Sequence, residues 1–315
     1  MLVDRRSTLA LIGAGVLVGC GRSGAASLRV GSQRAGTKSL MEASGILAGL
    51  PFTIEWAEFP ASQQLLEALA AGAIDLGGMG DAPFLFAYQG GSPIRSVRAT
   101  QHQPHSTDLA IIVPGDSSIR AVQELAGRTV ATGRGSAGHY LLLRVIEKAN
   151  IPLASVKMVF LSPGDAKSAL ASGAVDAWST WNPYAAAELL HGDGRILVDG
   201  RKYVAGFGFI AAPERAIEAK RAQIADFLNR YVQAEAWASG NIGAYAAVLK
   251  RETGLPADVA YQVANRTRIA VRTDSRVIQV EREVLETFAR TGTVKITRAL
   301  EPAFDTSFDK GLPTA

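Results

Sequence analysis

The segment Arg128–Ala149 reads RTVATGRGSAGHYLLLRVIEKA and changes its character twice. A β-branched run breaks at Gly133, and apolar residues with helical spacing begin at Tyr140. This pattern predicts a strand, a glycine turn and a helix. Ser136 stands where a helix N-cap belongs, so the free N–H groups of the first turn point beyond the end of the strand. A helix start of this kind receives an anion on backbone donors and on the positive end of the helix dipole.

The same pattern occurs twice in the chain, about 100 residues apart. LAAGAID at Leu69–Asp75 returns as LASGAVD at Leu170–Asp176, and VGSQRAG from Val30 matches VATGRGS from Val130. Two copies at this spacing predict two lobes, because a solenoid shows many shorter repeats. Alternating strands and helices predict open α/β sheets, which bind ligands at the carboxyl ends of their strands. Four strand-to-helix turns are therefore expected at the site, at Gly36, Asp81, Ser136 and Asn182.

The composition limits the classes of protein that fit. The chain has 315 residues, of which 48% are hydrophobic and 20% charged, and its net charge is +4. This length favours two lobes over one compact domain. The small net charge and the lack of a basic run argue against a nucleic-acid partner.

The first twenty residues have the pattern of a targeting segment. A positive region at Arg5 and Arg6 precedes an apolar stretch, Leu9–Val18, that is too short to span a bilayer. The tetrad LVGC ending at Cys20 resembles the lipobox of bacterial lipoproteins, in which the cysteine is lipidated and becomes the new amino terminus. We expect residues 1–20 to be this signal, 21–27 to be a tether, and the protein to be exported to the periplasm or cell surface with a lipid anchor. Plain secretory cleavage and twin-arginine export stay open.

Cys20 is the only cysteine in the sequence. The exported part therefore has no disulfide framework and no thiol nucleophile.

Two apolar runs, Asp108–Val113 and Val204–Ala212, are placed to cross between the lobes. We expect the first lobe to comprise 28–108 plus 213–315 and the second to comprise 109–212, with a hinge that closes around a ligand.

Four motifs resemble those of a known family. They are GMGDAPF at Gly78–Phe84, RGSAGHYLLLR at Arg134–Arg144, VDAWSTWNPYAAA at Val175–Ala187 and TGLP at Thr253–Pro256. In these residues and their order the chain resembles the aliphatic-sulfonate-binding proteins of ABC importers, relatives of the taurine and nitrate binders. The resemblance implies the type II periplasmic-binding-protein fold: two α/β lobes, two crossing hinge strands and a ligand cleft between them. It also implies delivery of the ligand to a membrane permease driven by a separate ATPase. We expect a monomer without cofactor or metal.

The chain departs from the family pattern at three positions. Members commonly carry Thr where Met79 stands, a second Pro where Phe84 stands, and Asp where Asn182 stands. We expect Met79 and Phe84 to make the pocket wall bulkier or more apolar, which bears on the choice of ligand.

A sulfonate is ionised at physiological pH, and burying its charge requires several donors. We expect these donors from the backbone of Gly80, Asp81 and Ala82 in the first lobe and of Ser136, Ala137 and Gly138 in the second. The Ser136 hydroxyl and the Gln33 amide would add to them.

The tail of the ligand needs an apolar or aromatic wall. Trp178 and Trp181 flank a strand end, and we expect Trp181 to face the cleft while Trp178 is the better candidate for the core. Asp176 could pair with an amino group such as that of taurine, although a structural turn carboxylate that mirrors Asp75 is the better interpretation. Phe207 is a weaker candidate for the wall.

Other functions fit the sequence less well. GRGSAG at Gly133–Gly138 also spells the dinucleotide fingerprint, but the next strand lacks the acidic residue that a ribose needs. A hydrolase needs G-x-S-x-G, and Arg134 stands at its first glycine. His102 and His105 could suggest a metal site, but no third or fourth ligand is evident near them. Desulfinases that resemble this fold use a cysteine nucleophile, and the only cysteine here is Cys20. Among anions, taurine, nitrate, an arylsulfonate or a sulfate ester stay open as ligands.

Overall fold

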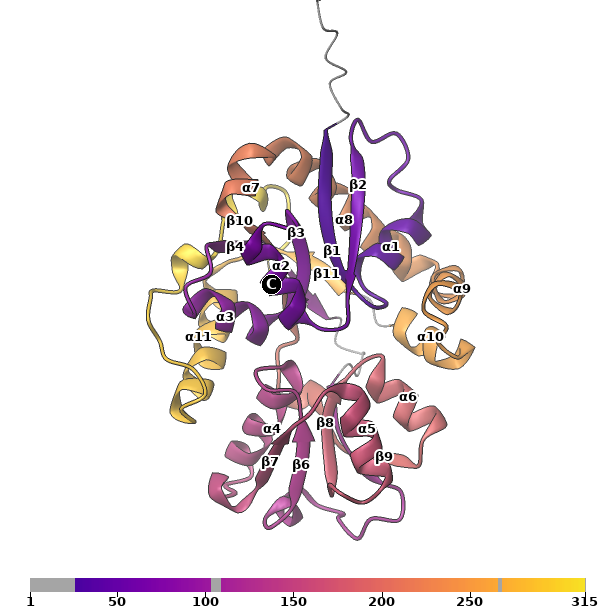
Figure 1. Cartoon of the computed structure of the whole chain (residues 1–315), viewed down its shortest axis with the longest axis vertical. Helices are drawn as coiled ribbons and strands as arrows, with labels where there is room; N and C mark the ends of the chain where they lie inside the picture. Colours follow the sequence, from indigo (N-terminus) through magenta and orange to yellow (C-terminus); the bar gives the residue numbers. More distant parts are fainter. Residues whose placement is uncertain (1–25, 103–108, 266–267, 315) are drawn as a thin grey trace, which may run out of the picture.

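The computed structural model describes residues 26–102, 109–265 and 268–314. The expected signal segment with Cys20, and the histidine at position 105, lie outside the described residues. The described part forms two lobes, each built on a mixed sheet with helices on both faces (Figure 1). The predicted α/β fold with two lobes is thereby confirmed.

The first sheet contains six strands among the described residues, in the order β11-β4-β10-β3-β1-β2. Strand β1 pairs in parallel with β2 and β3, whereas β10 runs antiparallel to both β3 and β4, and β11 runs antiparallel to β4. The bounds are β1 Ser27–Gln33, β2 Thr53–Phe59, β3 Leu76–Gly80, β4 Ile94–His102, β10 Phe207–Pro213 and β11 Arg268–Val271.

The second sheet has five strands in the described part of the chain, in the order β7-β6-β8-β5-β9. Their bounds are β5 Leu109–Pro114, β6 Thr129–Thr132, β7 Lys157–Phe160, β8 Ala177–Trp181 and β9 Gly194–Asp199. Apart from the extra edge strand β11, this order copies the first sheet strand for strand. The register is copied too, because Val30 pairs with Leu76 in the first sheet and Val130 with Ala177 in the second. The repeat seen in the sequence is therefore a repeat of topology.

Two layers of helices bury the faces of the first sheet. One core places α2, α3 and α11 on one face, and a second core places α1, α8, α9 and α10 on the other. In the second lobe α4 covers one face, and α5 and α6 cover the other. The bounds are α1 Thr37–Ser44, α2 Ser62–Ala71, α3 Asp81–Gln89, α4 Ala137–Lys148, α5 Pro163–Ala171, α6 Tyr184–His191, α7 Glu214–Ala219, α8 Arg221–Gly240, α9 Ile242–Thr253, α10 Ala257–Ala264 and α11 Ser275–Arg290. Short 3-10 turns occupy Val122–Leu125, Leu153–Ser155, Gly200–Lys202, Glu301–Ala303 and Thr306–Phe308.

The chain passes from the first sheet to the second between β4 and β5 and returns between β9 and β10. In Figure 1 the upper lobe accordingly combines the indigo start and the orange to yellow end of the chain, and the lower lobe is magenta to pink. Strand β10 hydrogen-bonds with β3 and β4 of the first sheet. The division expected from the sequence ends the second lobe at residue 212, so it assigns this strand to the lobe whose sheet it does not join.

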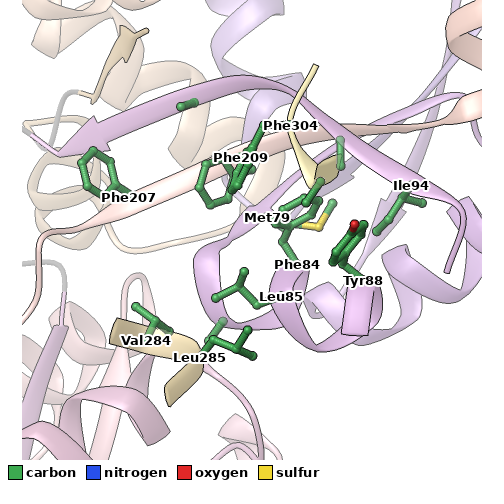
Figure 2. Close-up of a cluster of buried hydrophobic side chains, with 14 of the residues drawn as sticks. Met79, Phe84, Leu85, Tyr88, Ile94, Phe207, Phe209, Val284, Leu285 and Phe304 are labelled. Atoms are coloured by element: carbon green, nitrogen blue, oxygen red, sulfur yellow. The ribbon is translucent and has the colours of Figure 1, made fainter. Parts of the chain in front are cut away.

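An aromatic core lies beneath the start of α3. The ring centroid of Phe84 is 5.1 Å from that of Phe209 and 5.8 Å from that of Phe304 (Figure 2). Phe84 is fully buried in this core. The expectation that Phe84 makes the pocket wall bulkier is therefore wrong, since its side chain packs away from the wall. Met79 is also buried against this core, although it does line the cavity described below.

Candidate functional site

A cavity of about 280 Å³ is lined by residues of both lobes. Its lining includes Gly36 before α1, Asp81 at the start of α3, Ser136 before α4 and Asn182 before α6. These turns follow β1, β3, β6 and β8, so the carboxyl edges of the two sheets open onto the same space. Four helix starts, two from each lobe, thus meet at one cavity.

The start of α4 is held by a serine cap and a buried histidine. The Ser136 Oγ accepts a hydrogen bond from the His139 N–H at 3.2 Å, and the Gly135 N–H donates to the His139 Nδ1 at 3.2 Å. Burial, with a smaller contribution from the Arg134 cation, lowers the pKa of His139 to about 4. The ring is therefore neutral, as its role as acceptor requires. Ser136 and Ala137 line the cavity.

Gly138 does not line the cavity, although we expected it to. A Cβ at this position would lie 2.6 Å from the carbonyl oxygen of Ser179 on β8. The Ser179 hydroxyl also donates to the Gly138 carbonyl at 2.7 Å. The glycine thus lets α4 pack directly on the neighbouring strand, which fixes the direction of this helix start.

The start of α3 carries its own carboxylate into the cavity. Gly80 and Asp81 line the cavity, whereas Ala82 is fully buried behind them. The Ala82 N–H donates to the Asp81 Oδ1 at 2.6 Å, so this backbone donor, expected for the anion, already has an acceptor. Burial raises the pKa of Asp81 to about 6, against the opposing effects of this hydrogen bond and of the Arg268 cation.

An aromatic wall stands at the start of α6. Trp181 lines the cavity together with Tyr184, and the two rings meet edge to face with centroids 5.9 Å apart. Tyr184 was missed in the sequence, although its place directly after Asn182 and Pro183 puts it in the first turn of the helix. Gln33 also lines the cavity, and its amide Nε2 donates to the Gly78 carbonyl at 3.2 Å.

Asp176 and Trp178 lie away from the cavity lining. The Asp176 Oδ2 accepts from the Thr129 N–H at 2.8 Å, and its Oδ1 pairs with Arg128 at 3.4 Å. Asp75 binds Arg29 in the same way in the first lobe. Trp178 is 2% exposed and packs in the core beneath α5 and α6. These two residues stabilise the second lobe. They do not line the cavity, so the expectation that they contact the ligand is corrected.

The inner end of the cavity comes from the C-terminal part of the chain. Tyr231 and Glu235 of α8, Tyr245 of α9 and Arg268 of β11 line it, as does Phe207 at the start of β10. The Tyr231 hydroxyl donates to Glu235 Oε1, and the Arg268 backbone N–H donates to Glu235 Oε2 at 3.3 Å. Burial raises the pKa of Glu235 to about 7.

The inner end of the cavity could not be predicted from the sequence, for a physical reason. The spacing of Tyr231 in α8 marks it as a core residue, and a core tyrosine and a cavity tyrosine on one buried face share the same period. Arg268 is the first residue of a short strand and has no motif around it.

The chain is similar in sequence to a known family and to a named protein. The NMT1/THI5-like family matches residues 49–237. A protein of Escherichia coli (strain K12) named for the binding of aliphatic sulfonates is 35% identical over 236 residues, which are 74% of this chain and 73% of that protein.

Two solved structures share the fold. The alkanesulfonate-binding protein SsuA of Xanthomonas axonopodis pv. citri, bound to MOPS, superposes with a TM-score of 0.80 at 32% identity, covering 89% of this chain and 98% of that one. The periplasmic aliphatic sulphonate binding protein SsuA of Escherichia coli gives a TM-score of 0.77 at 31% identity, covering 91% and 92%.

Within the described ranges, no helix is long and apolar enough to cross a bilayer. The same residues contain no cluster of three acidic, histidine or cysteine side chains suited to a metal ion. With its family match, its relatives and its fold in agreement, the chain belongs to the NMT1/THI5-like family, in the group that contains the aliphatic-sulfonate-binding proteins.

Proposed function

We propose that this protein captures a sulfonate-type organic anion outside the cytoplasm and delivers it to an ABC importer. The observation that carries the proposal is the meeting of four helix starts, two from each lobe, at one cavity. A sulfonate presents three oxygens and a permanent charge, and rigid backbone donors stabilise that charge without ordering long side chains. The name of the Escherichia coli relative and the MOPS bound to the Xanthomonas relative support this class of ligand.

The aromatic wall suits the rest of such a ligand. Trp181 and Tyr184 stand edge to face at an interplanar angle of 87°, so together they present one ring face and one ring edge. An alkyl or aryl tail loses little by burial against such rings and gains contact area. We assign the tail to this wall and the anionic group to the helix starts.

The protein is proposed to bind its ligand without chemical turnover. Ser136 lies three residues before His139, but its oxygen accepts from the His139 backbone N–H. The ring nitrogen Nδ1 of His139 takes the Gly135 N–H instead, so this pair is not arranged as nucleophile and base. The sequence offers no cysteine nucleophile apart from Cys20.

We further infer how the protein is delivered and divided. Residues 1–20 act as the export signal, Cys20 carries a lipid, and 21–27 link the anchor to the folded part of a monomer. Because β10 pairs in the first sheet, we place the lobes at 28–108 with 207–315 and at 109–206. The ligand enters between them and the closed form is offered to the permease.

A thermal-shift panel tests the function. The purified protein is unfolded and refolded to remove carried-over ligand, then melted with alkanesulfonates, arylsulfonates, taurine, a sulfate ester, nitrate and NAD. A ligand at 100 times its dissociation constant adds about 2.7 kcal/mol of stability, which raises the melting temperature by several degrees. We expect the shift with sulfonates. A shift with nitrate or NAD alone would overturn the proposal.

A further inference from the structure

Gly78 and Gly80 of β3 line the first-lobe part of the cavity, and with the neighbouring Gly208 of β10 they form what we call the glycine floor. Gly80 of β3 pairs with Gly208 of β10, and Gly78 lies two residues earlier on the same face of β3. A Cβ on Gly78 would lie 2.9 Å from the Thr37 Oγ1, and a Cβ on Gly208 would lie 2.5 Å from the Arg268 Nη1. The missing side chain at Gly208 therefore leaves the space that the Arg268 guanidinium occupies.

Arg268 reaches this place from the edge of the sheet. It begins β11, pairs with His102 of β4, and extends its side chain across β4 to β10. Its Nη1 donates to the Thr100 Oγ1 at 2.9 Å, and its Nη2 contacts the His102 Nε2. Thr100 is 3% exposed and its own hydroxyl donates to the Gly208 carbonyl at 3.2 Å. The guanidinium is thus held in one position over the glycine floor.

Asp81 and Glu235 are close enough for the charge of the Arg268 guanidinium to lower their pKa, but among the described residues neither is hydrogen-bonded to the guanidinium. No carboxylate in the ranges that the structure describes forms an ion pair with Arg268, and three of the five N–H donors of the guanidinium have no acceptor among those residues. The carboxyls that share the cavity, Asp81 and Glu235, both have their pKa raised by burial, to about 6 and about 7. A half-buried cation with spare donors beside the α3 start favours an anion in the cavity.

We propose that Arg268, seated over Gly208, is a side-chain cation of the ligand site and donates hydrogen bonds to an oxyanion group of the ligand. This inference rests on the proposed function and deepens it. The backbone donors of the helix starts supply partial charges, whereas Arg268 supplies a full charge in a planar fork that matches two oxygens of one group. The ligand class is therefore an oxyanion held between the first-lobe floor and the helix starts of the second lobe.

Binding of MOPS by calorimetry to the refolded full chain tests the role of Arg268. Loss of a hydrogen bond to a charged group lowers affinity by roughly tenfold or more, so we expect Arg268→Gln to bind at least tenfold more weakly than the unmodified protein. Arg268→Lys keeps the charge but not the fork, and we expect an intermediate affinity. Arg95→Gln is the matched control, because Arg95 lies at the far end of β4 and pairs with Glu214.

Gly208→Ala changes the position of the Arg268 guanidinium without removing its charge. The added Cβ displaces the guanidinium while Arg268 itself remains, so we expect MOPS affinity to fall in the same direction as in Arg268→Gln. The melting temperature without ligand shows that each variant is folded. If Arg268→Gln or Arg268→Lys folds and binds MOPS as tightly as the unmodified protein, this inference is overturned and the proposed function stands. If the unmodified protein binds no sulfonate, the proposed function itself fails and takes the inference with it.

Discussion

Glu235 is 6% exposed at the inner end of the cavity, and burial raises its pKa from 4.5 to about 7. Tyr231, Tyr245 and Arg268 are the charged and titratable groups around it. Between pH 4.5 and pH 7 the unfolded chain gives up this proton before the folded one does. The contribution of Glu235 to stability is therefore fully present below pH 4.5 and is lost as the pH rises through 7.

Glu235→Gln removes this titration. We expect the free energy of unfolding of the variant, relative to the unmodified protein, to rise by roughly 2–3 kcal/mol between pH 5 and pH 8. Urea unfolding at the two pH values measures it. Only the change with pH counts, because the amide loses one acceptor at every pH. Glu218→Gln, on the exposed side of α7, serves as control and should give the same difference at both values. An equally flat result for Glu235→Gln would contradict the prediction.

At this scale the sequence predicts some cavity residues and misplaces others. Ser136 and Trp181 follow from local rules, since capping and strand alternation are properties of neighbouring residues. Gly138 and Asp176 share those local patterns, but their positions are explained by contacts with Ser179 and Arg128 that lie 41 and 48 residues away. Nothing in the local pattern separates a glycine that faces a ligand from one that faces a strand.

At the start of helix α4, one substitution is expected to affect both stability and ligand binding, and the two effects can be measured separately. Ser136→Ala removes the cap on the His139 N–H and the hydroxyl that faces the cavity. We expect a loss of about 1 kcal/mol in unfolding free energy and a roughly two- to tenfold weaker affinity for a sulfonate. Urea unfolding and calorimetric titration give the two numbers independently.

Helix α5 offers the matched control. Its cap, Ser162, accepts from the Asp165 N–H at 3.3 Å, is exposed and lies outside the cavity lining. Ser162→Ala should cost similar stability and leave affinity unchanged. Equal weakening of binding by both substitutions would show that α4 acts through stability alone.

The internal repeat explains why the helices and strands could be predicted from the sequence better than the single cavity residues. Both halves of the repeat consist of the same β-α units. Asp75 ties the start of β3 to β1, and Asp176 ties the start of β8 to β6 in the same way. The elements after residue 213 have no counterpart in the other half, and they supply the inner wall of the cavity. The sequence offers no internal copy against which to recognise that role.

Two different contacts join the lobes at the scale of the whole molecule. On one side Phe288 of α11 packs in the core, with its ring centroid 5.1 Å from that of His139 in α4, and Arg290 pairs with Glu147 at 2.8 Å. On the other side the contact is polar and exposed, with His191 of α6 2.8 Å from Asp258 of α10. Buried aromatic contacts cost far more to separate than an exposed ion pair, which contributes about 0–1 kcal/mol.

The lobes should therefore open on the α6–α10 side while the α4–α11 side stays together. Because Cys20 is the only cysteine, pairs of introduced cysteines can report this motion once Cys20→Ala has removed the native thiol. We expect the pair His191→Cys with Asp258→Cys to oxidise slowly without ligand and faster with a sulfonate, since ligand binding selects the closed arrangement. The pair Glu147→Cys with Arg290→Cys should oxidise at the same rate in both conditions. The opposite dependence, with the α4–α11 pair responding to ligand and the α6–α10 pair indifferent, would place the moving side at the aromatic contact and contradict the predicted direction of opening.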